Sequence, residues 1–237
     1  MRIACALLSL ALVATSASAE LTDPYPVIPE PMIFDMMRPL GARKGELEIN
    51  ALALTGAPFR PREAEWAPEV EYAFADGKAI EFELPFNGAR LEALKVGLQS
   101  ALGVSADGRT AHGVQYLGIY DRDSGHYSNT LLYMAGHRFS SRWSMMTIAG
   151  LDDISFGKAT GRNVLLLNQT TFYDLAPESV LGLELNVAGG QDRLIRVSPQ
   201  LHHRFSDTIN VQLAAGIERT TEHGAKPVTG IRLIRQF

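Results

Sequence analysis

From Gly45 to the end of the chain, apolar and polar residues alternate with a period of two. Around residue 70, for example, Val70, Tyr72 and Phe74 alternate with Glu69 and Glu71. Because successive side chains of a strand point to opposite faces, this pattern predicts strands with one apolar and one polar face. We expect about twelve strands, at residues 45–55, 65–75, 78–86, 91–102, 110–121, 127–138, 143–151, 162–174, 179–189, 193–204, 208–218 and 227–237. Counts of ten or fourteen also fit, because boundaries are the weakest feature of such a pattern.

The connections between these segments alternate between short and long. Residues 75–78, 139–142, 175–178 and 205–208 are short, and Ala75-Asp76-Gly77-Lys78 is typical of a hairpin turn. The intervening connections, at 56–64, 121–127, 151–162 and 218–226, are longer and more polar. Barrels of the bacterial outer membrane have short periplasmic turns and longer extracellular loops. The loop lengths therefore favour a single closed, antiparallel, up-and-down transmembrane β-barrel.

A soluble periplasmic β-sandwich is the alternative fold, since its strands also alternate. In a sandwich the apolar faces of two sheets meet inside, whereas in a membrane barrel they contact lipid and the polar faces line the interior. Apolar faces on most strands, the asymmetric loops and the terminal Phe237 favour the barrel. No apolar run after residue 19 is long enough for a transmembrane helix.

The first 44 residues differ from the rest. Residues 1–19 combine Arg2, an apolar stretch and a small-residue site ending at Ala19, which is typical of a cleaved secretory signal peptide. Residues 20–44 hold five prolines and predict an extended lead-in rather than strands. This lead-in either packs against or inside the barrel or forms a loosely ordered tail. The predicted organisation is a signal peptide at 1–19, a lead-in at 20–44 and a barrel at 45–237.

Composition excludes several function classes. The formal net charge is −4 with no basic block, which argues against nucleic acid as a partner. The single cysteine, Cys5, lies in the predicted signal peptide, so the mature chain has neither disulfides nor thiolate ligands. His202 and His203 are adjacent on a predicted strand, point to opposite faces and cannot share an ion. We expect no cofactor and no metal site.

The chain as a whole resembles the outer-membrane β-barrel proteins of Gram-negative bacteria. The final segment Ile231-Arg232-Leu233-Ile234-Arg235-Gln236-Phe237 is similar to the terminal strand read by the barrel-assembly machinery, with Arg235 as a departure. Residues 68–86 are similar to hairpins of outer-membrane transporters. The resemblance implies residence in the outer membrane, with its lipids and the assembly machinery, read through Phe237, as partners.

The inward faces carry an uneven set of charges. Carboxylates are expected on the first three strands and cations on the tenth and twelfth, so closure brings them together along one seam. The predicted lumen-lining residues are Glu48, Glu69, Glu71, Glu81, Glu83, Arg196, His202, Arg204 and Arg232. They favour a narrow porin or channel for small polar or charged solutes. A barrel plugged by a salt-bridge network, with no transport role, is the alternative.

A second alternative is a lipid hydrolase. His126 and Ser128 lie two apart on a predicted strand, so that an imidazole can activate a hydroxyl on the same face. The segment His126-Tyr127-Ser128-Asn129 resembles part of the His-x-Ser-Asn motif of outer-membrane phospholipases, which is a likeness of four residues. No third, orienting residue can be placed. A polar transition from loop to strand explains the segment better, and we expect no enzyme.

Overall fold

The computed structural model describes residues 25–56, 64–155, 161–190 and 193–237. The expected signal peptide at 1–19 lies outside the described residues, as does part of the long connections at 56–64 and 151–162. No helix of the described part of the chain is long and apolar enough to cross a membrane.

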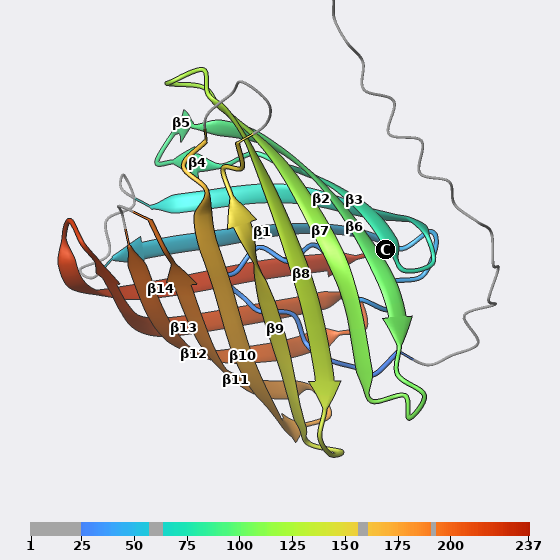
Figure 1. Cartoon of the computed structure of the whole chain (residues 1–237). Helices are drawn as coiled ribbons and strands as arrows, with labels where there is room; N and C mark the ends of the chain where they lie inside the picture. The colour runs from blue at the N-terminus through green and yellow to red at the C-terminus, as the bar shows by residue number, and fades with distance from the viewer. Residues whose placement is uncertain (1–24, 57–63, 156–160, 191–192) are drawn as a thin grey trace, which may run out of the picture.

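The described residues form a single sheet of antiparallel strands. β1 pairs with both β14 and β2, which closes the sheet on itself (Figure 1). The twelve strands of the wall are β1 (Leu47–Gly56), β2 (Glu65–Ala75), β3 (Lys78–Glu83), β6 (Ala93–Val104), β7 (Thr110–Asp121), β8 (Tyr127–Arg138), β9 (Trp143–Asp152), β10 (Val164–Ala176), β11 (Ser179–Ala188), β12 (Leu194–Ser206), β13 (Ile209–Thr220) and β14 (Gly224–Gln236). The predicted all-β, closed antiparallel barrel is confirmed.

The third strand ends earlier than the predicted 78–86. β3 stops at Glu83, and the chain then forms a small hairpin of β4 (Phe86–Asn87) and β5 (Arg90–Leu91). Pro85 has no backbone N–H to continue the ladder. Phe86 instead stacks on Trp66 of β2, with ring centroids 4.5 Å apart.

Outward and inward side chains differ along each strand as the alternation predicts. On β11, for example, Leu183 is 53% exposed whereas its neighbour Glu184 is 0% exposed. Large apolar side chains are exposed on the outside of every long strand of the described residues, including Leu98, Leu131 and Leu233. The wall is therefore apolar outside and largely polar inside.

Residues 25–46, the lumen segment, run inside the barrel (Figure 1). The segment enters at the end that carries the short turns, crosses the interior and returns to the same end, where β1 begins. Met32, Met36 and Met37 are at most 2% exposed. Ile28, Met36 and Leu40 pack in one buried apolar cluster with inward side chains of the wall such as Leu132 and Phe172. For residues 20–44 the sequence left two alternatives, packing against or inside the barrel or a loosely ordered tail. The described part, from residue 25, packs inside the barrel.

Candidate functional site

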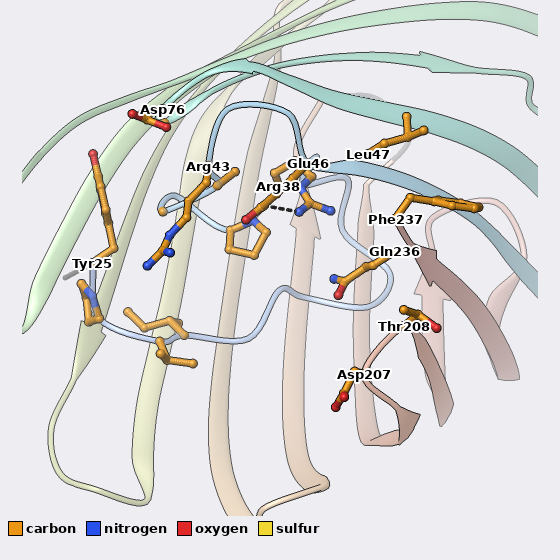
Figure 2. Close-up of a pocket in the computed structure, with 17 residues that line it drawn as sticks. Tyr25, Arg38, Arg43, Glu46, Leu47, Asp76, Asp207, Thr208, Gln236 and Phe237 are labelled. Carbon is orange, nitrogen blue, oxygen red and sulfur yellow. Dashed lines mark hydrogen bonds and ion pairs between the residues drawn. The ribbon is translucent and has the colours of Figure 1, made fainter. Parts of the chain in front are cut away.

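The lumen segment separates two cavities. The larger, of about 840 Å³, opens at the short-turn end, and Figure 2 shows Arg43, Asp76, Asp207 and Gln236 around it. The smaller, of about 240 Å³, lies nearer the long-loop end and is lined by Phe34, Asp152 and Arg196 among others. The space between them is filled by the segment and by the side chains that hold it. The candidate site is therefore the contact between the lumen segment and the wall.

A single carboxylate of β11 binds the turn of the segment. Glu184 accepts hydrogen bonds from three successive backbone N–H groups, those of Met32 (3.1 Å), Ile33 (3.1 Å) and Phe34 (2.8 Å). Successive N–H groups that converge in this way form an anion-binding nest. The same carboxylate accepts hydrogen bonds from the side-chain amides of Asn168, Asn186 and Gln200. Glu184 is thus fully buried and fully hydrogen-bonded.

Two glutamines hold the returning half of the segment. Gln115 on β7 accepts from the N–H of Met37 at 3.2 Å and donates to the carbonyl of Asp35 at 2.9 Å. Gln99 on β6 accepts from the N–H of Arg38 at 3.4 Å and donates to the carbonyl of Arg38 at 2.7 Å. These amides replace the partners that water or a strand would supply, so the irregular backbone is satisfied inside the barrel.

Ion pairs join the segment to the wall at three further points. Lys95 of β6 pairs with Asp35, and Arg232 of β14 lies 3.6 Å from Glu30. Arg38, from the segment itself, pairs with Glu48 at the start of β1. Lys95, Arg232 and Arg38 are each at most 5% exposed in their side chains. The three cations are buried, and each also pairs with a second carboxylate: Arg38 with Glu46, Lys95 with Glu83 and Arg232 with Glu69.

Inward-facing glycines make room for the apolar side chains of the segment. A Cβ added at Gly97 would lie 2.8 Å from the sulfur of Met37. Similar close approaches pair Gly113 with Leu40 and Gly136 with Ile28, and a Cβ at Gly230 would lie 3.2 Å from the terminal methyl of Met32. The segment and the wall are therefore complementary in shape as well as in charge.

The predicted lumen-lining residues occupy different positions in this arrangement. Those that are buried inside the barrel are Glu48, Glu69, Glu71, Glu81, His202 and Arg232. Glu83 and Arg196 are half-buried, and Arg196 pairs with Glu218. Arg204 is exposed at the end of β12, where its guanidinium donates to the carbonyl of Pro177 at 3.4 Å. Phe237 is 64% exposed and its N–H bonds the carbonyl of Leu47 at 2.9 Å.

Sequence reasoning did not select several residues that hold the segment. They are Lys95, Gln99, Gln115 and Glu184 of the wall and Glu30, Asp35 and Arg38 of the segment. The four wall residues alternate with apolar residues as the selected ones do, so the same signal was present. The segment has no such alternation, and nothing in its pattern marks which side chains meet the wall.

His126 and Ser128 are not hydrogen-bonded to each other in the part of the chain that the structure describes. The imidazole Nε2 of His126 instead hydrogen-bonds Asp153 at 2.8 Å. Burial raises the pKa of Asp153, but hydrogen bonds from His126 and Arg162 outweigh it and hold that pKa below its usual value. Asp153 thereby links His126 to Arg162 at the start of the β9–β10 connection.

The closed sheet, apolar outside and polar inside, defines a class: twelve-stranded barrels with the fold of outer-membrane channels. An outer-membrane channel from Pseudomonas putida has a similar structure, with a TM-score of 0.63 and 14% identity over 84% of this chain and 98% of that one. The NanC porin gives a TM-score of 0.61 with 9% identity, covering 79% of this chain and 98% of its own. The KdgM porin gives a TM-score of 0.59 with 9% identity, and the match covers 78% of this chain and 97% of the porin.

The family follows from the sequence itself. Residues 28–235 match the model described as HAEPLYID-like, and the chain belongs to this HAEPLYID family. The match begins within the lumen segment and ends in β14, so it includes both the wall and the residues that fill it. No curated protein sequence matches the chain.

Proposed function

We propose that this protein is an outer-membrane channel for small polar or charged solutes, held closed in this conformation by its lumen segment. One observation carries the proposal: the segment is bound through its backbone and through ion pairs to a polar wall, with a cavity on either side. A purely structural core needs no polar wall, because apolar side chains fill a narrow barrel well. The outward apolar face supports residence in the outer membrane, and the C-terminal strand supports recognition by the barrel-assembly machinery.

The lumen favours polar over apolar solutes. Its wall carries carboxylates on β1, β2 and β3 and cations on β6, β12 and β14, and a lining of both signs selects solutes by charge. Among similar structures, one is described as the KdgM porin in complex with disordered oligogalacturonate and another as the CymD monoaromatic hydrocarbon channel. These ligands differ in polarity, so we base the proposed solute class on the side chains that line the lumen of this chain.

Planar-bilayer recording tests the proposal. We compare the mature chain from residue 20 with a variant that begins at Lys44, which lacks most of the lumen segment but keeps every strand. The variant should show discrete, salt-dependent conductance steps, whereas the mature chain should be closed for most of the record. Both must first show heat-modifiable migration on gels, as a folded barrel does.

The structural barrel is the second candidate, favoured by the buried ion pairs that cross between segment and wall. If the barrel is purely structural, the variant that begins at Lys44 should fold but conduct no current, because wall side chains would fill the space left by the segment. A folded, silent variant would therefore replace the channel proposal with this one.

A further inference from the structure

Four glutamates of β2 and β3 face each other on the inner wall. Glu71 lies directly opposite Glu81, and Glu69 directly opposite Glu83. Like charges in directly opposite positions destabilise a strand pair. Glu71 and Glu81 are both 0% exposed. One carboxylate oxygen from each of Glu69, Glu71 and Glu81 lies within 4.8 Å of the others.

The charges around these glutamates do not balance. In the described part of the chain, the buried or half-buried carboxylates of this region outnumber the cations that pair with them by eight to three. The carboxylates are those of Glu30, Asp35, Glu46, Glu48, Glu69, Glu71, Glu81 and Glu83, and the cations are Arg38, Lys95 and Arg232. An excess of buried negative charge must be neutralised by bound cations or by protons.

The two nearest cations contact only some of the carboxylate oxygens. Arg232 approaches from one side, with its guanidinium 2.8 Å from Oε1 of Glu69 and 3.5 Å from Oε1 of Glu71. Lys95 approaches from the other side and lies 3.2 Å from Oε1 of Glu81. Among the described residues, Oε2 of Glu71 and Oε2 of Glu81 are buried without a hydrogen-bond partner, and Oε1 of Glu81 has only its ion pair with Lys95.

We propose that a divalent cation, best matched by Ca²⁺, binds between Glu69, Glu71 and Glu81. The ligand set is all carboxylate oxygen, which suits a hard cation rather than zinc or copper. Ca²⁺ accepts six to eight oxygens in irregular geometry, whereas Mg²⁺ demands a near-ideal octahedron. Three carboxylates from two neighbouring strands supply at least three of those oxygens. The proposed site departs from the expectation of no metal site, because that expectation was based only on histidine and cysteine as ligands.

Calorimetric titration of the mature protein in detergent micelles, after treatment with EDTA and its removal, tests the site. The probe is CaCl₂, with MgCl₂ as competitor. We expect saturable binding of one Ca²⁺ per barrel, with Mg²⁺ weaker. The double variant E71Q/E81Q should weaken Ca²⁺ binding at least tenfold. The matched control is E218Q, which alters another inward glutamate that pairs with Arg196 and Lys226 instead; its Ca²⁺ affinity should stay within twofold.

Thermal unfolding supplies an independent readout. Added CaCl₂ should raise the unfolding midpoint of the unmodified protein above that in NaCl of equal ionic strength, and should not raise that of E71Q/E81Q. In EDTA the double variant should be at least as stable as the parent, because the opposed charges are gone. The inference is overturned if the unmodified protein shows no saturable binding at millimolar Ca²⁺, or if the folded double variant binds equally well. Neither measurement depends on conductance.

Discussion

At the scale of single residues, Glu184 is the most heavily bonded contact of the lumen segment. Its two oxygens accept six hydrogen bonds, three of them from backbone N–H groups of the segment. Glu184→Gln replaces one acceptor oxygen with an NH₂ group that faces other donors. A buried group left without its partner costs about 1–3 kcal/mol. We therefore expect the open probability in bilayer recordings to rise about tenfold or more.

The control for this prediction is Glu178→Gln. Glu178 is exposed, in the turn that precedes the same strand, and its substitution also removes one negative charge. It should leave the open probability unchanged. Equal gating in both variants would mean that the nest does not hold the segment in place.

At the scale of elements, the inward glycines determine how closely the segment lies against the wall. Gly97→Val places new methyl groups where Met37 now packs, since a Cβ alone would lie 2.8 Å from its sulfur. Overpacking of this kind costs about 1–3 kcal/mol. The variant should keep its barrel, judged by heat-modifiable migration, but should expose the segment to added protease faster than the parent.

A compensating change separates this effect from general damage to the strand. Met37→Ala on the segment removes the side chain that meets the new methyl groups. The double variant G97V/M37A should regain much of the lost protease resistance. If it instead remains as sensitive as G97V alone, the valine acts on the wall and not on the segment.

The elements also show what the sequence can predict. Alternation identified every long strand, because an inward or outward side chain is a local property of extended backbone. It overran β3 because apolar residues continue past Pro85, where a second hairpin folds back on Trp66. The position of the lumen segment was left open because its contacts lie far away in sequence, as between Met32 and Glu184. Such contacts follow from barrel closure and not from any local pattern.

At the scale of the whole molecule, we expect the apolar outer face of the wall to contact lipid. Leu183 lies near the middle of β11 and is 53% exposed, and Leu175, near the end of β10, is equally exposed. Arginine at the bilayer midplane costs a barrel about 2–4 kcal/mol, and about 0–1 kcal/mol near the interface. Leu183→Arg should therefore lower the free energy of unfolding far more than Leu175→Arg, measured by reversible denaturation in lipid vesicles.

The substitution and the starting exposure are the same in both variants, which differ in depth and in local backbone, since Leu175 lies at the β-bulge between Asp174 and Ala176. In water, an exposed leucine changed to arginine alters stability by only a few tenths of a kcal/mol at either position. Equal, small effects at both sites would place the outer face in water and remove the basis for a transmembrane channel. A large effect at Leu183 alone would place the apolar outer face in the bilayer, as a transmembrane barrel requires.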